Sequence, residues 1–284
     1  DAYSRYLIDV VQDVTMEPNS SKPTLSKKVK GNNLKTEIEK VVVNEEGQET
    51  TVKEYIQDEK RNTATYKVPS ETYNAEDYDI QFELKSNIPD PDGYGTYKFE
   101  IVDILAKGFD YDRDSVKVLL GENEYPKQRE KVIKENEETS EDNKTETVEN
   151  YTIKDVVISA ENYAEYKNYF EEEGKEYPEE YKESQYGKTL ILIEINDLIG
   201  QIKDEVVTPG QDVIVRYNAK LNEKCEVGNT PNINEAYIKY SNDPYHNEKI
   251  TETTLQTTYT YTINLELIKI AEMTLRENNN SIEN

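Results

Sequence analysis

The chain has 284 residues, of which 33% are charged and 35% hydrophobic, and its net charge is −25. This acidity argues against a nucleic-acid partner, since binding nucleic acid needs clustered Lys and Arg. One cysteine, Cys225, excludes an internal disulfide and a Cys-rich metal site, and one histidine, His246, leaves almost no basis for histidine-assisted nucleophilic catalysis. We therefore expect no conventional enzyme, no cofactor and no bound metal.

The N-terminal part reads as an accessory strand followed by the start of the main domain. "SRYLIDVVQDVTMEP" (4–18) has strand character and runs into a polar linker, so we interpret 1–19 as the terminal strand of a preceding domain plus linker. No run of about 18 apolar residues predicts a membrane segment, and residue 1 does not open a signal peptide. We expect a mature or excised piece.

The main domain is assigned to 20–271 and begins with "PTLSKKVK" (23–30). Side chains alternate across a strand, so Leu25, Lys27 and Val29 share a face. Lys27 is then directed into the core, while Lys28 faces solvent. A buried lysine is costly unless it is paired or has reacted.

The middle of the domain contains two expected strand segments, 75–89 and 96–120. In the second, Asp103 falls on the same face as Phe99 and Ile101, so a carboxyl group is also directed into the core. The region 121–187 differs in composition, with the acidic stretch "ENEETSEDNKTET" and a Tyr- and Glu-rich stretch of helical character. We predict a charged, partly helical insertion there.

Strands resume at 188–200, 211–222, 233–244 and 257–271, and 272–284 is predicted to be a disordered tail. On 233–244, Asn234 shares a face with Ala236 and Ile238, which directs a carboxamide into the core as well. Many short alternating strands separated by Pro, Gly, Asn and Asp turns predict an all-β, immunoglobulin-like β-sandwich.

Each of these three polar residues also has an ordinary explanation. Asp103 could cap a turn, Lys27 could extend its amine to solvent along an apolar stem, and Asn234 could satisfy backbone groups. Asn242, in phase on the same strand as Asn234, and Lys28 are the alternatives for an amide and an amine partner.

Four segments carry a resemblance to a known family: "SRYLIDVVQDVTMEPNSSKPTLSKKVK", "AEDYDIQFEL", "YKFEIVDILAKGFDYDRDSVKV" and "LNEKCEVGNTPNINEAYIKYSNDP". In this order they resemble the isopeptide-forming domain of backbone pilins from sortase-assembled Gram-positive fimbriae. The resemblance implies a sandwich of the collagen-adhesin type with a self-formed Lys–Asn isopeptide bond assisted by an acid. The family's lysine falls on Lys27, its acid on Asp103 and its asparagine on Asn234.

Burial gives this set of residues a mechanism. Desolvation lowers the pKa of Lys27 and raises that of Asp103, which leaves a nucleophilic amine beside a protonated acid. We expect Asp103 to hydrogen-bond the carboxamide oxygen of Asn234 and to shuttle protons while ammonia leaves. The reaction happens once per chain, so the protein is its own substrate.

The expected function is that of a structural subunit of a cell-wall-anchored, extracellular pilus, whose partners are neighbouring pilin subunits and sortase. "EYPKQ" (124–128) is similar to the pilin motif whose lysine sortase joins to the next subunit, which makes Lys127 a candidate acceptor. The alternative is an adhesin domain that binds a host matrix protein or glycan through its tyrosine-rich strands or the 121–187 insertion. The acidic "PDPDG" lacks the ligand spacing of a known calcium loop.

Overall fold

The computed structural model describes residues 22–30, 36–43, 47, 49–56, 62–67, 79–134, 143–246 and 249–263. The strand expected at 4–18 and the tail expected at 272–284 lie outside these residues. Strands dominate the described residues, and the predicted all-β, immunoglobulin-like sandwich is confirmed.

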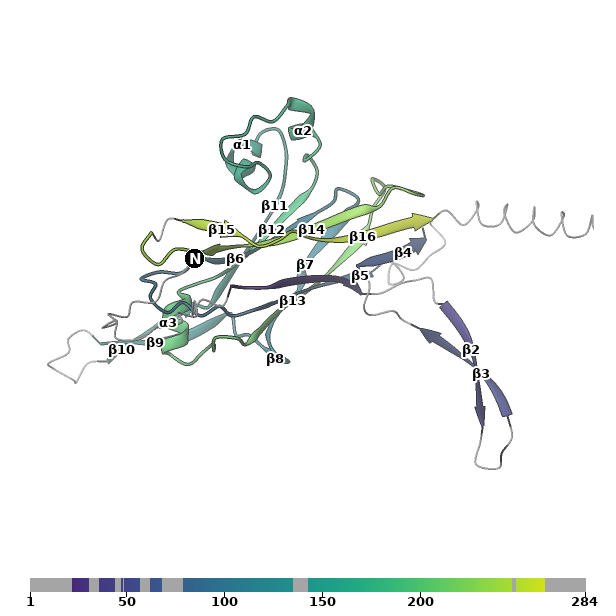
Figure 1. Cartoon of the computed structure of the whole chain (residues 1–284), viewed down its shortest axis with the longest axis horizontal. Helices are drawn as coiled ribbons and strands as arrows, with labels where there is room; N and C mark the ends of the chain where they lie inside the picture. Colours follow the sequence, from purple (N-terminus) through teal and green to yellow (C-terminus); the bar gives the residue numbers. More distant parts are fainter. Residues whose placement is uncertain are drawn as a thin grey trace, which may run out of the picture.

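Two sheets face each other across the core (Figure 1). The first is antiparallel, with five strands in the order β1 (Leu25–Lys30), β5 (Asp79–Asn87), β13 (Asp212–Leu221), β7 (Phe109–Leu120) and β8 (Asn123–Glu124). The second has the order β11 (Tyr151–Val157), β12 (Thr189–Ile195), β6 (Phe99–Leu105), β14 (Asn232–Ser241), β16 (Gln256–Ile263) and β4 (Thr63–Lys67), with β15 (Ile250–Glu252) also paired to β14. Only β16 and β4 run parallel among the described pairs.

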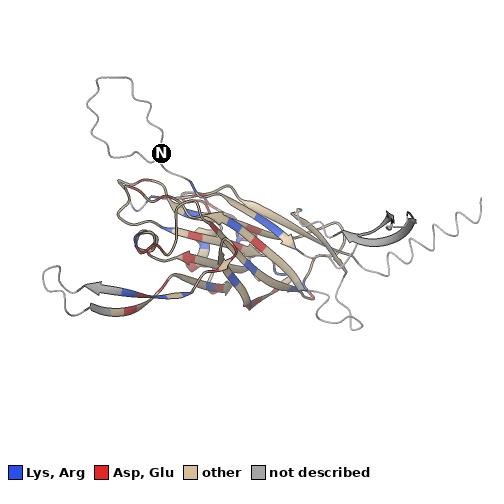
Figure 2. Cartoon of the chain, turned by 90° about the horizontal axis from the view of Figure 1, so that it is seen from below, with Lys and Arg blue, Asp and Glu red and all other residues tan. Residues whose placement is uncertain are grey.

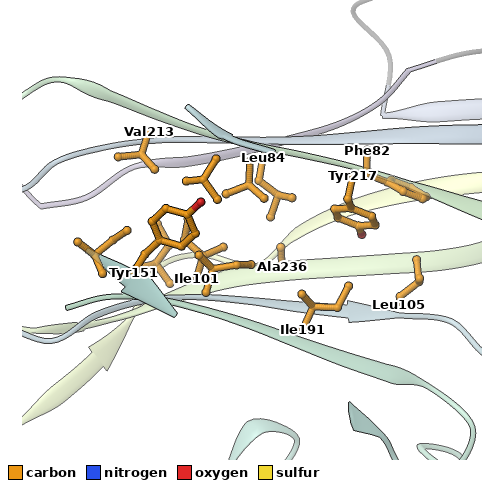
Figure 3. Close-up of a cluster of buried hydrophobic side chains, with 14 of the residues drawn as sticks. Phe82, Leu84, Ile101, Leu105, Tyr151, Ile191, Val213, Tyr217 and Ala236 are labelled. Atoms are coloured by element: carbon orange, nitrogen blue, oxygen red, sulfur yellow. The ribbon is translucent and has the colours of Figure 1, made fainter. Parts of the chain in front are cut away.

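The main core lies between the sheets and is built from alternate residues of each strand. On β13, every second side chain from Val213 to Leu221 is buried, while most of those between are partly exposed. Figure 3 shows Tyr217 between the two layers, with its hydroxyl group directed toward the sheet that carries Ile191 and Leu105. The inward face of β13 therefore places one phenol in an otherwise apolar layer.

The inner strand β6 of the second sheet is covered on both faces, so all seven of its residues are buried. The outer face of the sheet carries a second apolar cluster, covered by three short helical segments (Figure 1): α1 (Tyr163–Tyr166), η2 (Lys167–Tyr169) and α2 (Glu179–Glu183). The expected helical stretch breaks into these pieces because Gly174 has a positive φ of 79° and Pro178 stands before α2. Figure 1 places α1 and α2 next to β11 and β12.

Two hairpins extend from opposite ends of the sandwich (Figure 1). One pairs β2 (Thr36–Val43) with β3 (Glu49–Ile56), and the other pairs β9 (Gln128–Lys134) with β10 (Asn143–Glu149). Basic and acidic residues are interspersed along the strands in Figure 2. The excess of negative charge is thus spread over the surface, which favours solubility.

Two expected strand segments end differently from the prediction. The segment 188–200 stops at Ile195, and α3 (Leu198–Lys203) follows because the Asp197 carboxylate accepts a hydrogen bond from Gly200 N at 3.1 Å and caps the helix. The segment 96–120 divides into β6 and β7 at a turn that includes Gly108. A Cβ on Gly108 would lie 2.3 Å from Asn232 Oδ1, so only glycine fits this turn.

Candidate functional site

Four polar side chains meet between the sheets, two from each layer. β1 and β13 of the first sheet contribute Lys27 and Tyr217, and β6 and β14 of the second contribute Asp103 and Asn234. In the register of β14 with β6, Asn234 lies opposite Leu105, two residues along β6 from Asp103. The two side chains are therefore diagonal neighbours on one face.

The four side chains form a closed ring of hydrogen bonds. Lys27 Nζ donates to Asp103 Oδ1 at 2.6 Å and to Asn234 Oδ1 at 2.7 Å. The Tyr217 hydroxyl donates to Asp103 Oδ2 at 3.0 Å and accepts from Asn234 Nδ2 at 2.6 Å. Each carboxyl and carboxamide atom in the ring thus has a partner, as buried polar groups require.

The ring is sealed from solvent. The side chains of Lys27 and Asp103 are 0% exposed, Asn234 is 0% exposed and Tyr217 is 1% exposed. The ring of Phe82 lies 5.7 Å from Lys27 Nζ and packs on Tyr217 with centroids 5.3 Å apart. The charged forms of the amine and the acid therefore have no water to stabilise them.

This burial changes the acid–base properties of the site. Desolvation lowers the pKa of Lys27 to about 8, although the neighbouring Asp103 carboxylate opposes this. Desolvation raises the pKa of Asp103, against the opposing effect of Lys27. Burial, with the adjacent Asp103 charge, also raises the pKa of Tyr217 well above its ordinary value, so the phenol stays protonated. The amine and the acid are thus placed to exchange one proton across 2.6 Å.

The structure brings together all three core residues selected from the sequence. Lys28 is partly exposed on the other face of β1, and Asn242 lies one residue past the end of β14, where its backbone N–H donates to Lys249 O at 3.3 Å. Neither alternative is part of the ring. Lys127 is exposed in the turn between β8 and β9, where its carbonyl accepts from Asn150 N at 2.8 Å.

Two features of the site differ from the sequence-based expectation. The carboxamide oxygen of Asn234 accepts from Lys27 and not, as expected, from Asp103. Asp103 is hydrogen-bonded to Lys27 and Tyr217, and the phenol links it to Asn234 Nδ2. The sequence also does not single out Tyr217. A tyrosine on a core face does need a partner for its hydroxyl, but this is a weak signal in a chain with 23 tyrosines.

The described part of the chain holds no group of three His, Cys, Asp or Glu residues placed to bind a metal ion. None of its helices combines the length and the apolar character that crossing a membrane would require.

No family model matches the chain, and no curated protein matches its sequence. Similar solved structures include the major pilin subunit of Bacillus cereus, with 12% identity and a TM-score of 0.41 over 85% of this chain and 40% of that protein. The T6 backbone pilin of serotype M6 Streptococcus pyogenes has 14% identity and a TM-score of 0.42 over 85% of this chain and 36% of its own. The full-length major pilin SpaD of Corynebacterium diphtheriae has 15% identity and a TM-score of 0.37, over 84% and 35% of the two chains. The structural neighbours are thus Gram-positive pilin backbone subunits, and this chain spans 40% or less of the length of these three.

Proposed function

We propose that the chain is a structural domain of an extracellular, cell-wall-anchored pilus shaft, and that Lys27 and Asn234 form an intramolecular isopeptide bond with the help of Asp103. The observation that carries this proposal is the sealed hydrogen-bonded contact of amine, carboxyl and carboxamide between the two sheets. A core that serves only packing does not need a buried amine, carboxyl and carboxamide in contact, because burying each of these groups costs stability. The resemblance of the flanking segments to isopeptide-forming pilin domains supports the same assignment.

The first step is attack by the amine. Transfer of the shared proton to Asp103 leaves Lys27 Nζ uncharged, with a lone pair that can attack a carbonyl carbon. Nζ already lies 2.7 Å from Asn234 Oδ1, so the adjacent Cγ is within reach of a small side-chain rotation. Because the site excludes solvent, no hydration is available to stabilise the charged forms of the Lys27 amine and the Asp103 carboxyl group.

The overall reaction is a transamidation that needs no external reagent. The Nζ–Cγ bond forms, the Cγ–Nδ2 bond of Asn234 breaks, and Nδ2 leaves as ammonia after it gains one proton. Counted from the uncharged amine and the protonated acid, Nζ loses one proton to Asp103 for the one proton that reaches Nδ2, so Asp103 ends protonated, as it was at the start of the attack. The chain reacts once and is its own substrate.

The bond would suit a protein that carries tension. It would join β1 of one sheet to β14 of the other and close a loop of 207 residues. On the loop-entropy relation used for disulfides, such a closure restricts the unfolded chain by roughly 5 kcal/mol. Unlike a disulfide, an amide is not broken by reductants.

The partners that follow from this role are neighbouring pilin subunits and sortase. Lys127 is the candidate acceptor, because it lies in the segment "EYPKQ" and its residue is exposed between β8 and β9. A Lys127→Arg variant of the full-length pilin should lose the sortase-dependent ladder of polymers on a denaturing gel. An unchanged ladder would assign the acceptor role to another lysine and leave the isopeptide bond unaffected.

Intact mass spectrometry tests the central proposal. Wild-type protein should be lighter than its calculated mass by one ammonia, whereas Asp103→Ala should have its calculated mass. Far-ultraviolet circular dichroism of both proteins checks that the variant is folded. A folded wild-type chain with the full calculated mass would overturn the proposal.

A further inference from the structure

The two nitrogens of the proposed reaction are connected to different oxygens of Asp103, one directly and one through Tyr217. Lys27 Nζ, which must lose a proton, lies 2.6 Å from Asp103 Oδ1. Asn234 Nδ2, which must gain one, has its hydrogen bond to the Tyr217 hydroxyl at 2.6 Å, and that hydroxyl lies 3.0 Å from Asp103 Oδ2. The phenol therefore stands between the acid and the nitrogen that the acid has to protonate.

We propose that Tyr217 is a catalytic residue of isopeptide formation, and that its hydroxyl relays a proton from Asp103 to the departing nitrogen of Asn234. This inference rests on the proposed isopeptide chemistry. It separates two roles: Asp103 is the acid, and Tyr217 donates the proton to the leaving nitrogen.

The relay balances without any added reagent. Asp103 Oδ1 takes a proton from Nζ as the Nζ–Cγ bond forms, and the protonated carboxyl group releases a proton from Oδ2 to the Tyr217 oxygen. The phenol passes its own proton to Nδ2 as the Cγ–Nδ2 bond breaks and ammonia leaves. The relay starts with the Asp103 proton on Oδ2 and ends with one on Oδ1, so the carboxyl group and Tyr217 each end with one proton, as they began.

The surroundings of Tyr217 suit a relay rather than a base. Burial beside Asp103 disfavours the phenolate, so the hydroxyl can give a proton only while it receives another. The aromatic ring is held between Phe82, with centroids 5.3 Å apart, and Tyr111, with centroids 5.5 Å apart. For the relay to operate, the hydroxyl hydrogen turns from Asp103 toward Nδ2, and Nδ2, which donates to the hydroxyl oxygen in this structure, presents its lone pair instead once the Nζ–Cγ bond has formed.

The test is a refolding time course on the full chain. Unreacted protein is recovered from inclusion bodies in denaturant, where its full calculated mass is verified, and is refolded by dilution. Samples are quenched at intervals and the loss of ammonia is measured by intact mass spectrometry, while circular dichroism follows folding separately. We expect Tyr217→Phe to lose ammonia about 100-fold more slowly than wild type, in line with the usual contribution of a positioned proton donor.

Tyr111→Phe is the matched control. Its ring also touches Tyr217, but its hydroxyl is buried without a hydrogen-bond partner among the described residues. This variant removes a neighbouring phenol oxygen without touching the ring of hydrogen bonds. It should lose ammonia at the wild-type rate.

A solvent isotope measurement distinguishes proton transfer by Tyr217 from a purely structural role. It can be made on wild-type protein, so it does not depend on the folding of a variant. The rate of ammonia loss should vary with the deuterium fraction of the solvent along a curve, because more than one proton moves together, and Tyr217→Phe should give a straight line. A straight line for wild type, or a Tyr217→Phe chain that reacts at the wild-type rate, would overturn the relay and leave the isopeptide bond in place. A wild-type chain that folds and never loses ammonia would instead remove the proposed bond and the relay with it.

Discussion

At the scale of single residues, the feature that decides the chemistry of this protein is which of two adjacent lysines faces the core. Lys27 and Lys28 have the same side chain and the same strand, yet the side chain of Lys27 is 0% exposed and hydrogen-bonded, while Lys28 is partly exposed. Desolvation lowers the pKa of Lys27 to about 8. Position on the pleat thus makes the Lys27 amine a potential nucleophile and leaves Lys28 in contact with solvent.

Paired substitutions test this selectivity. Lys27→Ala and Asn234→Ala should each have the calculated mass, because each removes one of the atoms to be joined. The matched variants Lys28→Ala and Asn242→Ala should remain one ammonia short in intact mass spectrometry. A folded Lys27→Ala chain that still loses ammonia would show that another amine reacts.

The pH dependence of bond formation follows from the proton that Lys27 and Asp103 share. Above the Lys27 pKa of about 8 the pair loses that proton, so the amine is uncharged but Asp103 has nothing to donate toward the leaving nitrogen. The rate constant for ammonia loss after refolding should therefore be level just below pH 8 and decrease above it. An increase through pH 8 would instead mean that the uncharged amine alone limits the rate.

At the scale of elements, short helical segments cover the outer face of the second sheet and contact it through apolar, tyrosine and lysine side chains. Lys239 on β14 donates from Nζ to Asn168 O at 2.7 Å, and the same atom lies 4.5 Å from the centroid of the Tyr169 ring. The Tyr237 hydroxyl, also from β14, donates to Tyr169 O at 2.9 Å. These contacts hold η2 against β14, the strand that carries Asn234.

Removing one of these contacts should loosen the cover measurably. Tyr237→Phe deletes the hydroxyl that bonds Tyr169 O and should lower the free energy of unfolding by about 1 kcal/mol in guanidinium titrations. Tyr111→Phe is again the control, since its buried hydroxyl has no hydrogen bond to lose in the described structure. Equal stabilities for the two variants would show that the Tyr237 contact contributes nothing.

The sequence predicts strands and their inward faces well here, because a period of two is a direct consequence of strand geometry. That rule alone placed Lys27, Asp103 and Asn234 in the core and distinguished Lys27 from Lys28. It does not predict α3, because strand alternation says nothing about the helix that begins after the cap at Asp197. It also does not reveal Tyr217, whose role depends on the register between strands that lie far apart in the chain.

At the scale of the whole molecule, the site is a connection between the two layers of the sandwich. β1 is an edge strand of one sheet, and β14 is an inner strand of the other. In sequence they stand near the start and the end of the described residues, so most strands of both sheets lie between them. A bond from Lys27 to Asn234 would connect the two ends of the domain by a short covalent path that bypasses all of these strands.

Single-molecule stretching by the chain ends measures this directly. Without the bond, as in a folded Asn234→Ala chain, unfolding should release the 207-residue segment and lengthen the molecule by roughly 70 nm more than in wild type. The wild-type chain should show only the extension of residues outside the segment. The same long extension in both proteins would be incompatible with a covalent connection.

The separation of Lys27 and Asn234 along the chain has a further consequence for durability. Once the two side chains are joined, the backbone between them is a closed covalent ring with two tails. A protease that cuts this ring once would open it into a branched molecule rather than two fragments, and the tails would still be connected through the amide. A fibre built from such domains would therefore survive single cuts at most positions of its exposed loops and hairpins without being severed.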